Sequence, residues 1–457
     1  NKTQSDVKIL KGNLYKRFPF FASCGYIVYT MLKIIDLRTK KNLSSFTFHS
    51  TGTSNAVVEK SVADILARVK RYGDAALRHY SKNFDGVSIS SISVTTKEIS
   101  EARRKADPKF VAIVQQSIRN IRRFHEHQKR TNWKLNEKFG STLRQLFLPI
   151  EKVGVYVPGG KAAYPSTVLM NVIPAQTAGV KEIHLVSPPD KKGNIHPDVL
   201  LAASLLGIKN VYRVGGAQAV GALAYGTDTI PAVDKIVGPG NIFVATAKKM
   251  VYGIVGIDSF AGPSEVVILA DNSADASFVA ADMLAQSEHD ERASSILVTP
   301  SRSFAEKVKK EIDRHLSVLP RQEIMRKALN NQGKIFIVKS VQQGVDVVNM
   351  LAPEHLEIIT TNAEQDLKNI KHAGSIFLGN YSPVAIGDYY AGPNHVLPTE
   401  RTARFSSPLT VDDFIKKSSV IQYSQKHIEA VADTVATFAE HEGLTAHALS
   451  LRLRKKR

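Results

Sequence analysis

Residues 151–160, Glu-Lys-Val-Gly-Val-Tyr-Val-Pro-Gly-Gly, decide the fold class of this chain. Residues 153–157 form a short apolar run that ends at a proline and two glycines, a pattern typical of a buried strand that stops at a tight turn. A helical pattern follows over residues 167–178, and a second short strand is predicted over 182–186. A strand, a helix and a strand in this order predict a parallel sheet covered by helices.

The same alternation continues along the chain and predicts two α/β halves. One series of strands and helices runs to about residue 237, and a second runs from residue 264 to 378. Their likeness suggests a duplication, although the sequence contains no direct repeat between them. Apolar residues at three- and four-residue spacing predict two long helices between about 55 and 130, and the tail from Val411 is expected to be helical. The fold class is therefore α/β, with two Rossmann-like parallel-sheet halves and helical N-terminal and C-terminal segments.

Length and composition exclude several classes of protein. A chain of 457 residues is long enough for two or three domains with sizeable cores. It contains no run of about 18 apolar residues, so no transmembrane helix and no membrane partner are expected. The single cysteine, Cys24, excludes a disulfide within the chain and a cysteine zinc cluster, which favours a reducing, cytoplasmic location.

The formal net charge of +19 has two interpretations. A basic surface could bind nucleic acid or an anionic ligand, or the excess of lysine and arginine could simply lie on solvated helix faces. The basic residues come in small scattered groups within predicted helices, without interleaved aromatic residues. This scatter favours the solvated surface, and no nucleic-acid partner is predicted.

Residues 1–30 differ from the rest of the chain. Met31 begins a stretch that reads like a natural N-terminus, and the apolar patches before it are too interrupted for a signal peptide. Asp6 is the only acidic residue of this stretch, so an organelle transit peptide remains open as an alternative. We expect an extension without a catalytic role, which places Cys24 outside the catalytic part of the chain.

Three glycine-containing turns in the first half are candidates for a nucleotide site. They lie at residues 157–160, 214–218 and 237–241, each at the predicted end of a strand. In an open parallel sheet, ligands bind beyond the carboxyl ends of the strands, where glycine lets backbone amides approach a phosphate. None of the turns spells G-x-G-x-x-G, so tight turns without a ligand are the alternative. Tyr156 could pack against a ring or ribose, and Gln218 and Asn241 could add hydrogen bonds.

Four separated fragments could jointly build a metal site. They are residues 286–289, 387–389, 394–399 and 442–447, which offer imidazoles, carboxylates and a side-chain amide. This mixture suits a Zn²⁺ or Mn²⁺ that also holds a substrate. Each fragment alone has a simpler explanation, because a lone histidine is more often packed or exposed than a ligand. The candidate residues are Gln286 and His289 on one helix face, Asp388 beside a glycine, and Glu442 and His447 near the tail.

The pair Glu354–His355 follows Pro353, which ends a predicted helix. Histidine is suited to proton transfer near neutral pH, and a glutamate can activate a water molecule. A surface turn with two polar residues is the alternative interpretation for this fragment taken by itself.

These motifs, in this order, closely resemble the histidinol dehydrogenase family. The likeness extends from about Met31 to Leu453, and it is specific because many short motifs occur in one order. Besides the fragments above, the matching motifs are Gly238-Pro239-Gly240-Asn241, Ala261-Gly262-Pro263-Ser264-Glu265, Ala352 to Leu356, and Ala403-Arg404-Phe405-Ser406-Ser407.

The resemblance implies an enzyme that oxidises L-histidinol to L-histidine through an aldehyde with two NAD⁺. It also implies a homodimer with one Zn²⁺ per active site. The implied metal ligands, which also contact substrate, are Gln286, His289, Asp388 and His447, the last from the partner subunit in this family. The further implied contacts are Ser264, His355 and Glu442 with the substrate, and Tyr156, Gln218 and Asn241 with NAD.

The chemistry of the residues agrees with this assignment. The metal would hold the amine and imidazole of the substrate, His355 would remove the alcohol proton, and Glu354 would activate water to hydrate the aldehyde. A covalent thiohemiacetal is implausible because Cys24 lies in the extension. A metal-dependent hydrolase with Glu354 as base is the second candidate, and the choice between zinc and manganese is left open.

The expected division of the chain follows from these motifs. It is an extension at 1–30, a helical region at 31–155, a first α/β domain that binds NAD at 156–263, a second α/β domain with metal and catalytic residues at 264–408, and a helical segment at 409–457 that contributes to the partner's site.

Overall fold

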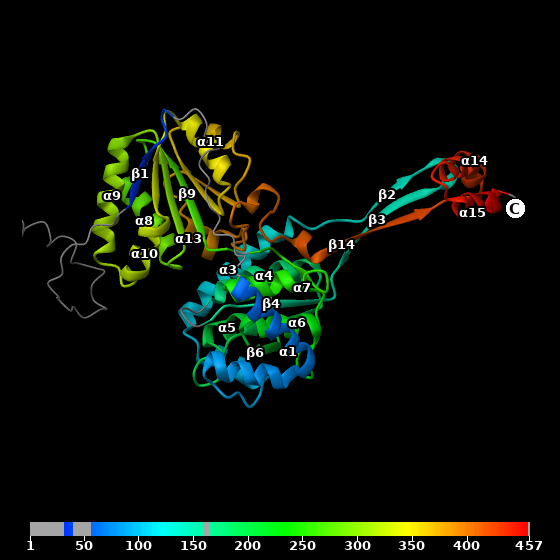
Figure 1. Cartoon of the computed structure of the whole chain (residues 1–457), viewed down its shortest axis with the longest axis horizontal. Coiled ribbons are helices and arrows are strands. Elements are labelled where there is room, and N and C mark those ends of the chain that lie inside the picture. Colours follow the sequence, from blue (N-terminus) through cyan, green and yellow to red (C-terminus); the bar gives the residue numbers. More distant parts are fainter. Residues whose placement is uncertain (1–31, 40–55, 160–163, 261, 456–457) are drawn as a thin grey trace, which may run out of the picture.

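The computed structural model describes residues 32–39, 56–159, 164–260 and 262–455 (Figure 1). The predictions for residues 1–30, Cys24 included, lie outside the described residues. So do Gly160 and Ala261 of the quoted motifs.

The first α/β domain contains a five-stranded parallel sheet. Its order is β6-β5-β4-β7-β8, with β4 (Lys152–Tyr156), β5 (Glu182–Ser187), β6 (Asn210–Arg213), β7 (Lys235–Val237) and β8 (Gly256–Ile257). Two apolar clusters cover its two faces. The helices on one face are α2 (Thr96–Lys105), α3 (Pro108–Glu126), α4 (Pro165–Ala178) and α5 (Pro197–Leu205), and those on the other are α1 (Ala56–Tyr80), α6 (Gly216–Tyr225) and α7 (Ile242–Val251).

The second α/β domain contains a six-stranded parallel sheet. Its order is β1-β11-β10-β9-β12-β13, with β1 (Lys33–Asp36), β9 (Glu265–Ala270), β10 (Ser294–Thr299), β11 (Lys334–Ile337), β12 (His355–Ile359) and β13 (Ser375–Leu378). Apart from β1, both sheets follow one order in the chain: third, second, first, fourth and fifth strand. The helices are α8 (Ala276–Ser287), α9 (Arg302–Leu316) and α10 (Gln322–Gln332) on one face, α11 (Val341–Leu351) and α12 (Ala363–Leu367) on the other, and the short α13 (Val384–Ile386). The predicted α/β class with two parallel sheets is confirmed.

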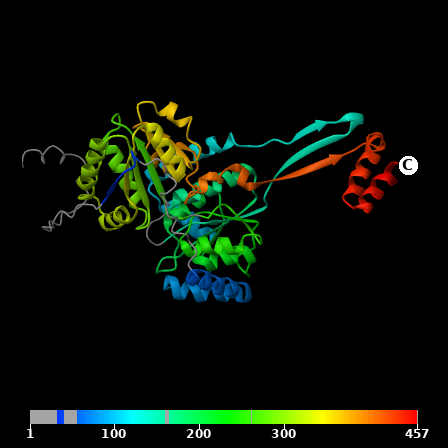
Figure 2. The same cartoon turned by 45° about the horizontal axis from the view of Figure 1, so that its top comes forward.

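An arm extends away from both α/β domains (Figures 1 and 2). It begins as an antiparallel sheet of β2 (Trp133–Asn136), β3 (Thr142–Pro149) and β14 (Ile415–Gln422), and it ends in α14 (Gln425–His441) and α15 (Thr445–Lys455). The two terminal helices share only a small core of Ala436, Ala439 and Ala448. The arm therefore lacks a core of its own comparable with those of the domains.

The structure differs from the expected elements at both ends. Three helices rather than two lie between residues 56 and 126, because Thr95 and Asp107 each cap a new helix N-terminus. The region expected to be helical also holds β2 and β3, and the tail expected to be helical holds β14. Strand β1 pairs with β11 and so joins the second sheet. No helix of the described ranges is long and apolar enough to span a bilayer.

Candidate active site and cofactor cavity

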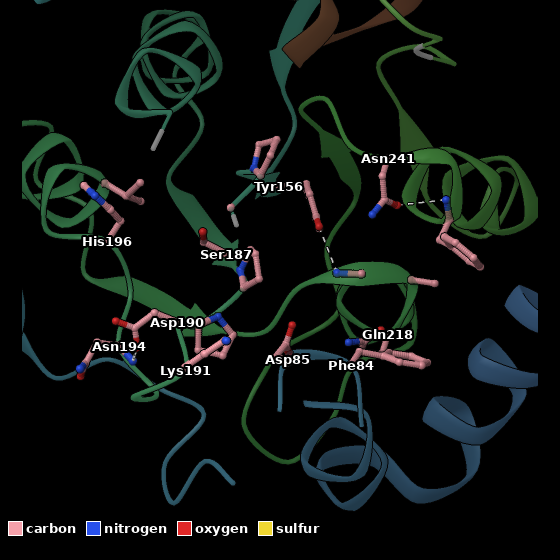
Figure 3. Close-up of a pocket in the computed structure, with 18 of the residues that line it drawn as sticks. Phe84, Asp85, Tyr156, Ser187, Asp190, Lys191, Asn194, His196, Gln218 and Asn241 are labelled. Carbon is pink, nitrogen blue, oxygen red and sulfur yellow. Dashed lines mark hydrogen bonds between the residues drawn. The ribbon is translucent and has the colours of Figure 1, made fainter. Parts of the chain in front are cut away.

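A cavity of about 940 Å³ opens at the carboxyl ends of the strands of the first sheet (Figure 3). Tyr156 at the end of β4, Gln218 in the first turn of α6 and Asn241 before α7 all line it. The three residues predicted to bind the cofactor thus come together. They meet where the strand order changes direction at β4, which is the usual ligand position in such sheets.

The turn after β6 is held by Tyr156. The backbone N–H of Gly216 donates a hydrogen bond to the Tyr156 hydroxyl over 3.0 Å. Burial raises the pKa of Tyr156 to about 12, so the hydroxyl stays neutral. Gln218 is only 1% exposed, and its Oε1 has no hydrogen-bond partner in the described parts of the chain. A buried oxygen without a partner is costly unless a ligand supplies a donor.

The turn after β7 is held by a buried ion pair between Lys248 and Asp258. Lys248 Nζ donates to the Gly238 carbonyl over 3.0 Å, and the Gly238 N–H donates to Asp258 Oδ2 over 2.7 Å. Gly238 has a φ of 110°, and a Cβ there would meet the Tyr156 carbonyl at 2.2 Å, so only glycine fits. The pair positions Asn241, whose Oδ1 accepts from the N–H groups of Phe243 and Val244 at the start of α7.

The predicted catalytic pair lies at the opposite, amino-terminal edge of the second sheet. His355 is the first residue of β12, beside the start of β9. The Glu265 N–H donates to Glu354 Oε2 over 2.7 Å, and His355 Nδ1 lies 2.9 Å from the Glu265 carbonyl oxygen. A carbonyl only accepts, so His355 carries its proton on Nδ1 and leaves Nε2 as a lone-pair base. These two contacts of the Glu265 backbone, with Glu354 and with His355, are called the Glu265 clamp below. Ser264 directly precedes Glu265.

The predicted metal ligands other than His447 lie beside this pair. Gln286 lies in the last turn of α8, and His289 follows it by three residues. Asp388 lines two cavities, one of about 490 Å³ with His289 and one of about 200 Å³ with His355 and His395. The segment that follows Asp388 is anchored to α3, because Ser117 and Asn120 donate hydrogen bonds to the carbonyl oxygens of Tyr389 and Tyr390. The structure thus brings His289, Asp388, Glu354 and His355 to one place, with Gln286 about one helical turn before His289.

Burial governs the charge of this cluster. Burial raises the pKa of Asp388 to about 7 and raises that of Glu354 well above its ordinary value. Burial also lowers the pKa of His355 to about 4, with further lowering by His289 and His395, and it lowers the pKa of His289. Neutral imidazoles are ready to ligate a metal, and a bound cation would reverse the unfavourable burial of the carboxylates.

One observation tests whether these residues fit a metal ion. Gln286 is 4% exposed, and its Nε2 has no hydrogen-bond partner among the residues described. Because rotation of the amide exchanges its oxygen and nitrogen, the side chain can present Oε1 at this buried position as an acceptor for a cation. An amide oxygen, an imidazole and a carboxylate form a donor set that suits zinc when a fourth ligand joins them.

Glu442 and His447 do not join this cluster within the chain. Glu442 follows α14 and His447 lies in α15, both exposed near the far end of the arm (Figures 1 and 2). Accordingly, no group of three or more His, Cys, Asp or Glu side chains in the described ranges could hold a metal. The site of a single chain is one ligand short of the predicted set.

Comparison with known proteins decides the family. The family model for histidinol dehydrogenase matches residues 49–455. The chain belongs to the histidinol dehydrogenase family. It is 53% identical over 398 residues to histidinol dehydrogenase of Bacillus subtilis, covering 87% of this chain and 93% of that one. It is 50% identical over 407 residues to the enzyme of Oceanobacillus iheyensis, covering 89% and 95%.

A solved structure agrees with this assignment. The crystal structure of histidinol dehydrogenase from Elizabethkingia anophelis superposes with a TM-score of 0.87 at 36% identity, covering 94% of this chain and 99% of that one. The resemblance predicted from the motifs is therefore confirmed, and the protein is a dehydrogenase of the histidinol dehydrogenase family.

Two residues of the histidinol dehydrogenase site received no role from the sequence. Glu265 lies within a quoted motif, yet only the structure reveals that its backbone holds both Glu354 and His355. His395 was quoted only as part of the fragment 394–399, and it lies half-buried in the same cavity as Asp388, with a pKa lowered by burial to about 4. Their positions beside matched motifs were the available signal.

Proposed function

We propose that the protein oxidises L-histidinol to L-histidine through histidinaldehyde and reduces two NAD⁺ in succession. The observation that carries the proposal is the clamp of Glu265 on Glu354 and His355, which presents a neutral imidazole and a carboxyl group beside Asp388. The cofactor would occupy the cavity lined by Tyr156, Gln218 and Asn241. A cytoplasmic location is inferred only from the single cysteine of the chain.

A zinc ion would be held by Gln286, His289 and Asp388 together with His447 of the partner subunit. When bound, the zinc supplies positive charge that orients the substrate's nitrogen and oxygen atoms, and NAD⁺ accepts the hydride. Ser264 and Glu442 would contact the substrate, as would the metal ligands. The buried, unpartnered Gln286 amide supports this set, and manganese remains the alternative metal.

His355 would act as the base in both oxidations. Its Nδ1–H donates to Glu265, and its Nε2 is buried without a partner among the described residues. The imidazole is therefore neutral and fixed in one tautomer, so Nε2 can take the proton of the alcohol and later that of the hydrate.

Glu354 would activate the water that hydrates the aldehyde. One carboxylate oxygen accepts the Glu265 N–H, which leaves the other oxygen for a water molecule. Burial raises the pKa of this carboxyl group, and an ionised carboxylate of raised pKa is a stronger base toward water.

The arm supports a homodimer with shared sites. Many apolar side chains of the arm are exposed, with Phe438 reaching 68% exposure, and so large an exposed apolar surface is typical of a subunit interface. The arm also carries Glu442 and His447 away from the body of their own chain (Figure 2). A second chain that covers the arm would receive both residues at its own site.

The direct test counts NADH formed per histidinol consumed. We expect a ratio of two, loss of activity with a zinc chelator, and recovery when zinc is restored. The alternative hydrolase would release product without an increase in nicotinamide absorbance, and that result would contradict the proposed oxidation.

Shared sites predict complementation between inactive variants. When His289→Ala and His447→Ala proteins are mixed, a hybrid dimer contains one site with all ligands intact. Random exchange should therefore restore roughly a quarter of the activity per total chain, because half of the dimers are hybrids and each has one of two sites intact. Activity is measured after subunit exchange has been verified by mass spectrometry, with each variant incubated alone as control. Absence of recovery after full exchange would mean that His447 acts in its own chain.

A further inference from the structure

The cofactor cavity contains an acidic residue to which neither the motifs nor the catalytic mechanism gives a role. Asp85 ends a short π-helical turn, Ser81–Asp85, directly after α1, and it lines the cavity together with Phe84. Figure 3 shows its carboxylate pointing into the cavity between Lys191 and Gln218. Asp85 Oδ2 is buried and has no hydrogen-bond partner in the described chain.

Two acceptor oxygens are thus buried at one wall without donors: Asp85 Oδ2 and Gln218 Oε1. Each costs free energy unless a ligand brings an N–H or O–H group. Burial also raises the pKa of Asp85 to about 6, which the nearby Ser81 hydroxyl offsets only in part. At neutral pH the group is mainly a carboxylate, and its Oδ2 lacks a donor among the described residues.

Only some groups of a dinucleotide can donate a hydrogen bond to Asp85 and Gln218. Its pyrophosphate carries negative charge and no donor, so it is repelled by Asp85, whereas each ribose offers two adjacent hydroxyl donors. Lys191 is the only lysine or arginine among the described residues that line the cavity, and it is the natural partner for the phosphates.

The position of Asp85 identifies which ribose it meets. The cofactor cavity lies next to the cavity of about 490 Å³ lined by His289 and Asp388, called the substrate cavity here, because residues close in sequence line the two. Pro158 and Pro197 line the first cavity, while Tyr164 and Asp198 line the second. The nicotinamide must enter there to reach the catalytic pair. No residue of the Ser81–Asp85 turn lines the substrate cavity, so Asp85 belongs to the adenosine end.

We propose that the carboxylate of Asp85 binds the hydroxyls of the adenosine ribose and thereby selects NAD over NADP. Phe84, 60% exposed and stacked on Tyr80 at 5.3 Å between ring centroids, offers a flat apolar surface to the adenine. A 2′-phosphate would replace a hydroxyl donor by a group of about −1.5 to −2 charge beside the carboxylate. The inference rests on the proposed function, since it assumes that the cavity holds a nicotinamide dinucleotide.

The test compares Asp85→Asn with a matched variant, Asp190→Asn. Asp190 lines the same cavity, but its Oδ1 already accepts the N–H groups of Lys192 and Asn194, so it has no need of a ligand donor. Both substitutions remove one negative charge. We expect Asp85→Asn to raise KM for NAD⁺ about tenfold with little change in kcat and to lower the preference for NAD⁺ over NADP⁺ by about tenfold or more. Asp190→Asn should leave the preference unchanged.

A binding measurement on the unaltered protein keeps the inference testable if a variant fails to fold. ADP-ribose should raise the melting temperature, whereas ADP-ribose 2′-phosphate at the same concentration should not. Equal stabilisation by both compounds, or an equal loss of preference in the two variants, would overturn the role of Asp85. A wild-type protein that binds ADP-ribose but does not oxidise histidinol would instead contradict the proposed function alone.

Discussion

His289→Ala and Asp388→Ala proteins are expected to lose bound zinc and to fall in activity by about three orders of magnitude while remaining folded. Each change removes a donor from a set whose charge orients the substrate, and such charge contributes several kcal/mol to a transition state. The fold should survive because burial already disfavours the charged form of Asp388, so its removal relieves a desolvation cost. Zinc is measured on dialysed protein by elemental analysis, and folding by thermal unfolding.

Asp346→Ala is a suitable control because Asp346 is an exposed carboxylate on α11, away from the candidate ligands. It should keep both zinc and activity. Full zinc occupancy in the dialysed His289→Ala and Asp388→Ala proteins would show that these residues do not hold the metal.

Glu354→Gln should impair oxidation of supplied histidinaldehyde by about 10² to 10⁴-fold while slowing the first hydride transfer from histidinol much less. The amide keeps an acceptor for the Glu265 N–H but cannot take a proton from water. His355→Asn should impair both oxidations, because a proton is removed from the alcohol in one and from the hydrate in the other. Its amide N–H can still donate to the Glu265 carbonyl, so the local structure is retained.

Pre-steady-state NADH traces separate the two hydride transfers. The two variants serve as controls for each other, because both alter the same clamp on Glu265. If Glu354→Gln slows the first transfer as severely as the second, the proposed division of roles is wrong.

The elements of the two sheets were predictable because their signals are local. Residues 153–157 form an apolar run that ends at turn residues, residues 182–186 carry apolar side chains at Ile183, Leu185 and Val186, and β4 and β5 lie there. The convergence of the three predicted cofactor-binding residues in one cavity has a related reason. Tyr156 ends β4, Gln218 and Asn241 follow β6 and β7, and the carboxyl ends of parallel strands meet at one edge.

The arm illustrates where local patterns fail. Strands β2, β3 and β14 have weakly buried side chains, β2 is only four residues long, and β3 and β14 lack the alternation of apolar and polar residues that identifies a strand. Strand β14 forms because it pairs with β3 across about 270 residues of sequence, as in Val420 opposite Arg144, whereas β2 pairs with the nearby β3. Strand β1 joins the second sheet through a similarly distant pairing with β11.

By itself, the sequence determined the α/β class, the two-sheet plan and the family, because strand and helix periodicities and ordered motifs are properties of neighbouring residues. It also supplied the candidate residues of the active site. Only the tertiary structure decided that the catalytic pair sits at the amino-terminal edge of the second sheet, where β9 and β12 bring Glu265 against Glu354 and His355. It also decided that His447 lies on an arm away from the other predicted metal ligands of the same chain. It further decided that Asp85 lies in the cavity proposed for the cofactor. These positions depend on how elements remote in sequence pack against one another, and local sequence patterns do not specify that packing.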